Sequence, residues 1–244
     1  MSLEAPWEKR LHKAVRHFWA TRQNQAKLQG AKTGSRDAGE RTAVTGGKQL
    51  DGFVALVRDY LIECGVAKSE IHSNLVAELP GWYRAEKRWD LLVIVNGNLV
   101  IAMEFKSQVG SFGNNFNNRA EESLGSATDI WTAYREGAFP ITQRPWLGYV
   151  MILEDADGST TPVAVKEPHF PVFPEFKDAS YAKRYEILLS KLIRERLYDG
   201  AALLMTSRSS GPKGDYSEPG PDLGRANLLA SIKARILAVR EPKS

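Results

Sequence analysis

Residues 89–106 read WDLLVIVNGNLVIAMEFK, two almost wholly apolar runs joined by Asn96 and Gly97. Asn-Gly favours a tight two-residue turn, because such a turn needs a positive φ at both central positions. β-Branched and aliphatic residues on either side of that turn predict a β-hairpin. Because both strands are apolar on both faces, we expect the hairpin to lie buried between layers of helices.

The far ends of this hairpin carry charged residues. Side chains alternate along a strand, so Glu104 and Lys106 share one face of the second strand, and Phe105 points into the opposite layer. A hairpin brings its two ends together, which places Asp90 beside that pair. Two carboxylates and an ammonium group at the mouth of a buried hairpin are costly to bury unless the protein uses them.

A divalent-metal site is the use that fits these residues. Mg²⁺ is held by one or two carboxylates together with waters and phosphate oxygens. We expect Asp90 and Glu104 to hold Mg²⁺, with the backbone carbonyl of Phe105 as a further ligand. We expect Lys106 to orient or deprotonate an attacking water and to offset charge on a phosphate. The alternative is structural: Asp90 caps the entry of a strand, and Glu104 and Lys106 form an ordinary ion pair at a sheet edge.

Composition limits the class of protein. The 244 residues are enough to bury a full core, and a hydrophobic content of 43% is ordinary for a globular protein. The net charge of +4 is mildly basic, which makes nucleic acid the commonest kind of partner. The single cysteine, Cys64, excludes an internal disulfide and a Cys-rich zinc site. No apolar run reaches the ~20 residues that a membrane span needs, so we expect a cytoplasmic location and no membrane partner.

Hydrophobic periodicity divides the chain into alternating helices and strands. Helices are predicted at residues 6–31, 49–64, 119–136, 179–198 and 226–239. Strands are predicted at residues 91–95, 99–103, 146–153 and 201–206, with a short strand within 69–79. The wholly apolar strand at 146–153 suggests the centre of the sheet. This order predicts an α/β fold with a mixed central sheet flanked by helices.

Basic and amide side chains gather in loops around the proposed site. Over residues 1–48, basic residues outnumber acidic ones ten to four, and residues 84–88 make the approach to Asp90 basic. Residues 110–118 read as a loop with four asparagines, a side chain that can pair with adenine edges, and Asn118 caps the next helix. The residues expected to bind DNA are Lys48, Asn114, Asn115, Asn117, Arg119, Arg208 and Lys213. The alternative for each is an ordinary solvated loop or turn residue.

Four further acids lie near the site in the sequence without an assigned role. Asp51 either faces the metal or favours the dipole of its helix, and we prefer the dipole. Glu78 is close enough to Asp90 in the sequence to contact the metal ligands without binding the metal itself. Glu121 and Glu122 lie on the first turns of the helix predicted at 119–136, where they face the metal or are only solvated.

The order of the site residues resembles the PD-(D/E)xK nuclease superfamily. Here Asp90 is followed, after thirteen residues, by Glu104-Phe105-Lys106, and Trp89 stands where the superfamily name has Pro. Neighbouring stretches narrow the resemblance: TGGKQLDGF at 45–53, PGWY at 80–83 with KRWD at 87–90, and MEFKSQ at 103–108. With them, nearly the whole chain resembles the XhoI-type restriction endonucleases.

This resemblance implies a PD-(D/E)xK restriction-endonuclease-like core and a Mg²⁺-dependent homodimer acting on double-stranded DNA. It implies cleavage of both strands of the palindrome CTCGAG, leaving 5′ overhangs and 5′-phosphates. A cognate DNA methyltransferase is expected in the same system, but not as a physical partner. We expect one nuclease domain over residues 1–244. It comprises a basic N-terminal helix and loop (1–48), a catalytic core (49–206), and a loop and C-terminal helix (207–244).

Three other functions compete with this interpretation. A repair or structure-specific nuclease of the same fold would cut without tight sequence dependence. A non-catalytic DNA-binding module would bind DNA without Mg²⁺-dependent turnover, and the presence of Lys106 argues against it. A glycosidase using Asp90 and Glu104 as an acid–base pair would leave Lys106 and the basic loops without a function.

Overall fold

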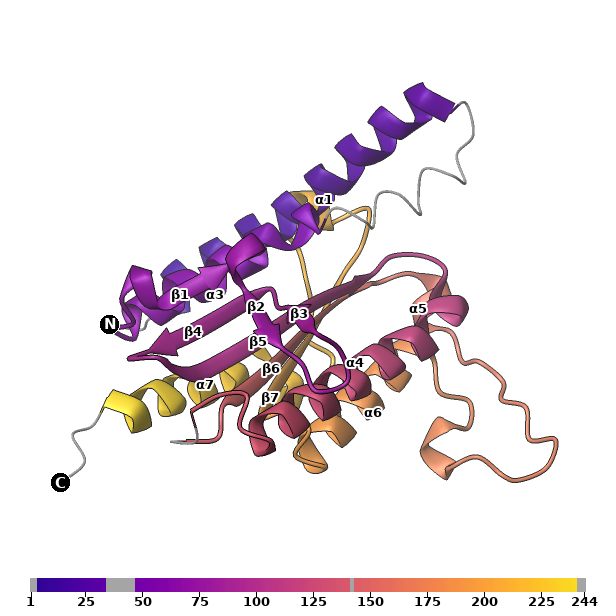
Figure 1. Cartoon of the computed structure of the whole chain (residues 1–244). Coiled ribbons are helices and arrows are strands. Elements are labelled where there is room, and N and C mark those ends of the chain that lie inside the picture. Colours follow the sequence, from indigo (N-terminus) through magenta and orange to yellow (C-terminus); the bar gives the residue numbers. More distant parts are fainter. Residues whose placement is uncertain (1–3, 34–46, 141–142, 241–244) are drawn as a thin grey trace.

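The computed structural model describes residues 4–33, 47–140 and 143–240, and these form three layers (Figure 1). The middle layer is a five-stranded sheet in the order β1-β4-β5-β6-β7. Its strands are β1 (Ile71–Ser73), β4 (Leu91–Val95), β5 (Asn98–Gln108), β6 (Trp146–Glu154) and β7 (Gly200–Thr206). β1, β4 and β5 pair antiparallel, whereas β5, β6 and β7 pair parallel. The mixed central sheet predicted from the sequence is confirmed.

The hairpin forms as predicted from β4 and β5. Asn96 and Gly97 both have positive φ, at 50° and 75°, as a tight turn requires. Most of both strands is buried. β6 is buried along its whole length and lies inside the sheet, between β5 and β7. The sequence suggested that this strand would be at the centre, but the middle strand of the five is β5.

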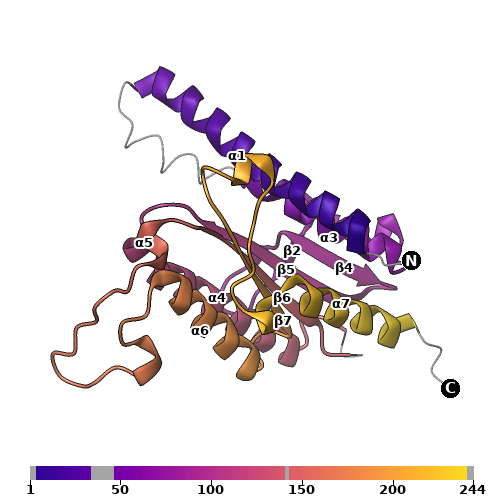
Figure 2. The same cartoon turned by 180° about the vertical axis from the view of Figure 1, so that it is seen from behind.

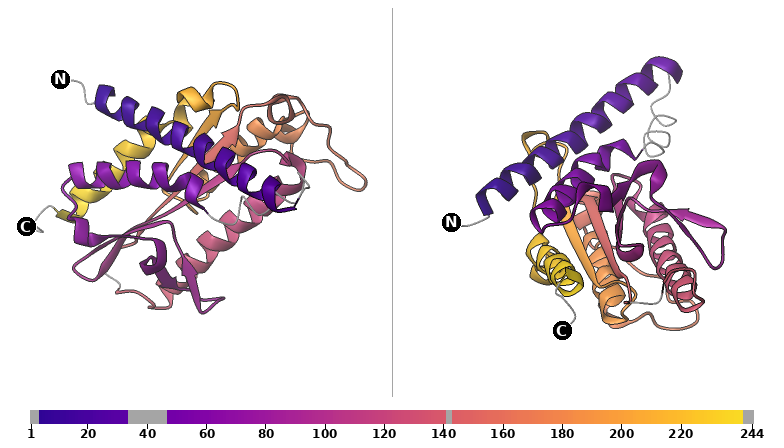
Figure 3. Two further views of the ribbon diagram at one scale, coloured as in Figure 1. Left: turned by 90° about the horizontal axis from the view of Figure 1, so that it is seen from above. Right: turned by 60° about the vertical axis from the view of Figure 1, so that its left-hand side comes forward.

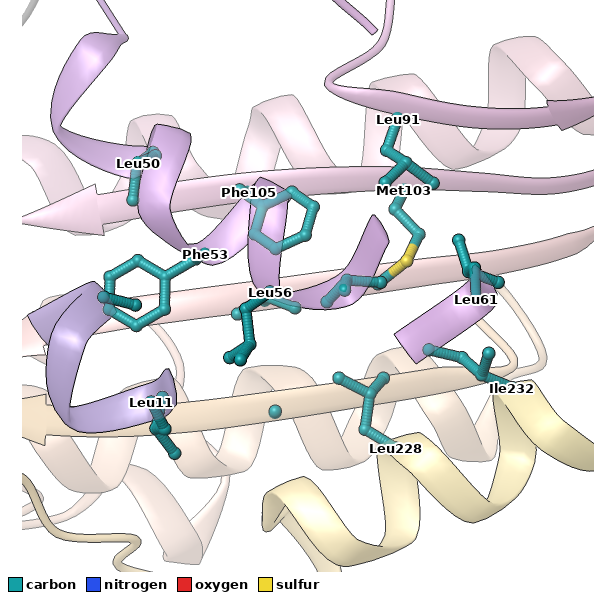
Figure 4. Close-up of a cluster of buried hydrophobic side chains, with 14 of the residues drawn as sticks. Leu11, Leu50, Phe53, Leu56, Leu61, Leu91, Met103, Phe105, Leu228 and Ile232 are labelled. Atoms are coloured by element: carbon teal, nitrogen blue, oxygen red, sulfur yellow. The ribbon is translucent and has the colours of Figure 1, made fainter. Parts of the chain in front are cut away.

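Helices cover both faces of the sheet, as Figures 2 and 3 show from other directions. One face is covered by α1 (Glu4–Thr33), α3 (Asp51–Glu63) and α7 (Arg225–Arg240), and the other by α4 (Phe112–Arg135) and α6 (Tyr181–Arg194). Alternation along β5 divides its side chains between two cores. Met103 and Phe105 pack with Phe53 and Leu56 of α3 (Figure 4), whereas Ala102 packs on the α4 side.

Short elements connect these layers. Residues 74–90 include a second, two-stranded sheet of β2 (Glu78–Pro80) and β3 (Glu86–Arg88), which the sequence did not reveal. The other short helices are η1 (Lys48–Leu50), η2 (Lys68–Glu70), η3 (Asn74–Val76), α5 (Asp157–Thr160), η4 (Pro174–Phe176), η5 (Gly211–Lys213) and η6 (Pro221–Leu223). Within the described ranges, none of the helices has the length and apolar character needed to cross a membrane.

The start of α4 is the main error of the sequence-based prediction. The helix begins at Phe112, seven residues before the predicted start, so the asparagines expected in a loop lie in helical turns. Tertiary packing explains the difference, because Phe112 and Phe116 share a helix face and contact Tyr181 of α6, and Phe116 also contacts Tyr185. These ring contacts outweigh the preference of asparagine for turns. The predicted helices at 6–31, 49–64 and 226–239 are confirmed, whereas α6 is shorter than predicted.

Candidate active site

The charged ends of the hairpin meet on the α4 side of the sheet. The Glu104 side chain is only 3% exposed, and its Oε1 accepts from Lys106 Nζ at 2.9 Å and from Lys87 Nζ at 3.0 Å. Lys87 reaches this position from β3 and lies 4.5 Å from the centre of the Trp89 ring. A buried carboxylate is therefore shared by two ammonium groups.

Asp90 arrives from the start of β4. Its backbone N–H donates to the Met103 carbonyl at 3.2 Å, and its Oδ2 accepts from the Phe105 N–H at 2.7 Å. The Asp90 side chain thus accepts the Phe105 N–H hydrogen bond that a backbone carbonyl would accept if β4 extended further toward its N-terminus. The N–H and C=O of one strand residue point to the same neighbour, so the Phe105 carbonyl faces the Asp90 side as well. Asp90, Glu104 and Lys106, which the sequence predicted to lie together, therefore do so in the structure.

The surroundings shift the pKa values of the two carboxyl groups in opposite directions. Burial raises the pKa of Asp90, although the N–H of Phe105 and the ammonium of Lys106 act against it. Burial also opposes ionisation of Glu104, but the ammonium groups of Lys106 and Lys87 together outweigh it and lower the pKa of Glu104. Burial favours neutral Lys106, yet the carboxylates of Glu104, Asp90 and Glu122 together outweigh burial and raise the pKa of Lys106. Opposed pKa values of neighbouring acids are typical of functional sites.

The site has donor atoms suited to a hard cation. Glu104 Oε2 is buried without a hydrogen-bond partner among the described residues, and a buried acceptor in that state calls for a ligand or a water. In the described part of the chain, no group of three or more His, Cys, Asp and Glu side chains is arranged to hold a metal. Two carboxylates and a backbone carbonyl remain, a set that fits Mg²⁺ and its retained waters.

A pocket of about 470 Å³ opens beside Asp90. Its lining includes Asp51 at the start of α3, Arg58 about two turns further along the same helix, and Arg88 of β3. Asp51 therefore lies on the wall of the same pocket as Asp90, while also standing in the first turn of its helix, so both of its interpretations stay open.

The other three acids occupy different places. Glu78 lies on β2 and pairs with Arg88, with Oε1 2.6 Å from Nη2 and both side chains largely exposed. Glu122 of α4 lies beside the site, with Oε2 4.0 Å from Lys106 Nζ, and it also pairs with Arg119. Glu121 is exposed.

The residues predicted to bind DNA are spread over three regions. Asn114 and Asn117 are exposed on the first turns of α4, and Asn115 donates to the Ser111 carbonyl at 3.1 Å. Arg119 folds inward, with its side chain 15% exposed. Lys48 is exposed at the start of the described segment that precedes α3.

The two predicted DNA contacts beyond residue 206 lie in a loop that packs against α1. His12 Nδ1 hydrogen-bonds with the Gly214 carbonyl at 2.8 Å, and Trp19 Nε1 donates to Thr206 Oγ1 at 3.1 Å. Lys213 is exposed on this loop. Arg208 pairs with Glu154 at the end of β6, at 2.5 Å.

Two residues with polar contacts in or near the site, Lys87 and Asp129, were not identified from the sequence. Lys87 was expected only to make the approach basic, and its contact with Glu104 depends on the pairing of β2 with β3. Asp129, buried on α4, accepts hydrogen bonds from Trp82, Tyr83 and Arg84. An acid inside a run of apolar helical residues is the one local signal that could have indicated Asp129.

Comparisons with known proteins identify the family of this chain. Residues 29–218 match the family described as restriction endonuclease XhoI. The type II restriction enzyme BstVI of Geobacillus stearothermophilus is 52% identical over 207 residues, which are 82% of this chain and 92% of that protein. AbrI of Azospirillum brasilense is 48% identical over 70% of this chain and 77% of its own length. XhoI of Xanthomonas vasicola is 42% identical over 78% of this chain and 76% of its own.

No solved structure matches the chain. The family match covers most of the sequence and includes Asp90, Glu104 and Lys106. The three relatives all carry the name of a type II restriction enzyme. This chain therefore belongs to the XhoI family of restriction endonucleases, which are type II site-specific deoxyribonucleases.

Proposed function

We propose that this enzyme cuts both strands of double-stranded DNA at the palindrome CTCGAG in a Mg²⁺-dependent reaction that leaves 5′ overhangs and 5′-phosphates. The target sequence rests on the family resemblance, and the metal rests on the site itself. The observation that carries the chemistry is the buried Oε2 of Glu104, which lacks a partner among the described residues and lies on the hairpin that carries Asp90.

Each residue of the site has a distinct task in this proposal. Asp90 and Glu104 would hold Mg²⁺, with the Phe105 carbonyl as a further ligand, and the ion would supply Lewis-acid activation of the phosphate. Lys106 donates to Glu104 through one of its three ammonium protons, and its side chain is 26% exposed. It orients the attacking water and offsets charge that develops on the phosphate. Glu122, 4.0 Å away, limits the positions that the Lys106 ammonium can take.

A palindromic target requires a two-fold assembly. One active site cuts one strand, so cleavage of both strands at a symmetric sequence is most simply achieved by a homodimer whose symmetry matches that of the DNA. Exposed Asn114 and Asn117 at the start of α4 are candidates for base contacts in the major groove, and basic residues such as Lys48 and Lys213 for phosphate contacts.

Plasmid cleavage tests this proposal. Incubation of the purified protein with plasmid DNA should give discrete fragments with Mg²⁺ and none with EDTA, and sequencing the fragment ends should return CTCGAG. Another shared end sequence would correct the target and keep the enzyme class. Smeared products would indicate a nonspecific or structure-specific nuclease, and an intact plasmid in both conditions would favour a DNA-binding module.

Asp90→Asn should change the metal response of cleavage. Asparagine keeps an oxygen that can accept from the Phe105 N–H but lacks the charge that binds Mg²⁺. We expect cleavage to fall by more than the roughly 10- to 100-fold that altering an outer partner of a metal costs. The measurement is a titration of cleavage rate against Mg²⁺ concentration. A variant with a normal rate and a normal Mg²⁺ midpoint would contradict the assignment of Asp90 as a metal ligand.

A further inference from the structure

The loop that joins β2 to β3, residues 81–85, exposes two adjacent aromatic rings; we call it the aromatic tip. Trp82 is 53% exposed and Tyr83 is 69% exposed. Each ring could bury a large apolar surface, so two neighbouring rings in solvent are typical of a binding surface. The plasmid-cutting chemistry described above does not involve them.

Hydrogen bonds to a buried carboxylate of α4 hold the aromatic tip in place. Asp129 of α4 is 2% exposed, and it accepts from the N–H groups of Trp82 at 2.9 Å and Tyr83 at 2.8 Å and from Arg84 Nε at 2.8 Å. A Cβ at Gly81 would lie 2.7 Å from Asp129 Oδ2, so only glycine fits there. A buried carboxylate is costly without such bonds. Here all its bonds serve to hold the rings of the tip in one position before any partner arrives.

The tip lies beside the proposed cutting site along α4. Glu122, which is 4.0 Å from Lys106, and Asp129 are seven residues apart, so they share a helix face at a separation of about 10 Å. Asn115 stands seven residues on the other side of Glu122. The cutting site therefore lies between the asparagines of α4 and the aromatic tip. Figure 1 shows the β2–β3 connection passing close to α4.

Duplex DNA is the partner that this surface fits. Of the three basic residues in 80–88, Lys87 pairs with Glu104 and Arg88 with Glu78, whereas Arg84 is 44% exposed at the tip, where a cation suits a polyanion. Arg84 uses Nε for Asp129, which leaves its two Nη groups for a backbone phosphate. Exposed aromatic rings bind nucleic acid by stacking on bases or by inserting into the minor groove.

We propose that the aromatic tip binds the same DNA duplex close to the cut phosphate, because Glu122 beside Lys106 and Asp129 beneath the tip are only ~10 Å apart along α4, roughly the rise of three base pairs. Trp82 and Tyr83 contact sugars and base edges, and Arg84 contacts the backbone. This inference rests on the proposed function, because it requires the DNA to cross the cutting site, which lies between the asparagines of α4 and the tip.

Tryptophan fluorescence can observe this contact directly. The chain has six tryptophans, and the other five are between 2% and 8% exposed, so acrylamide quenching reports mainly on Trp82. The intact protein is titrated with acrylamide in EDTA, with and without a saturating 20-base-pair duplex carrying the sequence recovered from the plasmid ends. Saturation is verified by the anisotropy of a labelled copy. We expect the readily quenched fraction to disappear when the duplex binds, and to be absent from Trp82→Phe with or without DNA.

The outcomes separate this inference from the proposed function. A wrong target sequence changes only which duplex is used, because the plasmid ends identify it. Full acrylamide access to Trp82 in the saturated complex would overturn the inference while leaving the nuclease assignment intact. Loss of access without DNA, on raising the protein concentration, would also overturn it and assign the tip to a subunit interface.

Substitutions give an independent measurement of the same contact. Trp82→Ala combined with Tyr83→Ala should weaken binding of that duplex by at least about tenfold, since stacking contributes substantially per aromatic ring. Phe170→Ala removes a ring that is 83% exposed on another loop, and it should leave the affinity unchanged. Both variants should keep the wild-type melting temperature, since the rings are exposed. Equal affinities for the double variant and Phe170→Ala would count against the aromatic tip.

Discussion

Lys106→Ala should bind its DNA site with nearly unchanged affinity and cut it about 10²- to 10³-fold more slowly, the range seen when one preorganised donor is removed from a reaction centre. The Lys106 ammonium contacts the buried Glu104 carboxylate and also reaches solvent, since the Lys106 side chain is 26% exposed whereas that of Glu104 is 3% exposed. In the proposed mechanism, its loss would remove the donor nearest to the attacking water and would leave the proposed metal ligands in place.

Binding and cleavage must be measured separately to test this prediction. Affinity is measured by anisotropy in EDTA, and cleavage is measured in a single turnover with Mg²⁺ and excess enzyme. Lys177→Ala is the matched control, because Lys177 is 49% exposed and pairs with the partly exposed Glu167 at the surface. A Lys106→Ala enzyme that cuts at the wild-type single-turnover rate would rule out the role given to this residue.

Glu104→Gln and Asp90→Asn should both lose cleavage but should shift the stability of the metal-free protein in opposite directions. At neutral pH in EDTA, Glu104→Gln should lower the free energy of unfolding by about 1–3 kcal/mol, because two ammonium groups lose their shared carboxylate. For a chain of this size, that corresponds to a fall of several degrees in melting temperature. Asp90→Asn should raise the melting temperature.

The opposite signs follow from the opposite pKa shifts. The pKa of Glu104 is lowered in the folded protein, so its ionisation stabilises the fold above the ordinary glutamate pKa, and this contribution is lost as the pH falls through the folded value. The pKa of Asp90 is raised, so it stabilises the fold below the ordinary aspartate pKa and ceases to do so as the pH rises through the folded value. As the pH rises through the folded value, ionisation of Asp90 therefore costs stability that the amide avoids.

Thermal unfolding of the two variants and the wild type in EDTA measures both shifts. Glu78→Gln is the matched control, because Glu78 also pairs with a basic residue of β3 but lies at the surface, where an ion pair contributes little. Its melting temperature should stay close to that of the wild type. If Glu104→Gln melted no lower than Glu78→Gln, the buried carboxylate would not be needed to neutralise Lys87 and Lys106.

The hairpin was predictable from sequence because its determinants are local. Asn96 and Gly97 specify the turn, alternation places Glu104 and Lys106 on one face, and the turn itself brings Asp90 to them. The hydrophobic faces of α1 and α3 were predictable for the same reason, since helical spacing reveals a buried face.

The remaining features depend on contacts between distant residues. The early start of α4 is decided by rings of α6 that follow Phe112 by about seventy residues. Asp129 contacts a loop 45 to 47 residues earlier, and no pattern around either segment indicates the pairing. Lys87 reaches Glu104 only because Leu79 and Lys87 are partners in the β2–β3 ladder. Such contacts are properties of the packed structure and are absent from any single stretch of sequence.

The position of the hairpin has a consequence for how this family can diversify. The residues that we propose to cut are carried by one short, continuous segment. The pairing of β4 with β5 and the hydrogen bond that the Asp90 side chain accepts from the Phe105 N–H hold that segment in shape. The exposed amides of α4 and the aromatic tip lie on other segments. Mutations that alter which DNA is recognised can therefore accumulate on those surfaces while the cutting hairpin is inherited unchanged, so new target specificities can evolve without reinventing the chemistry.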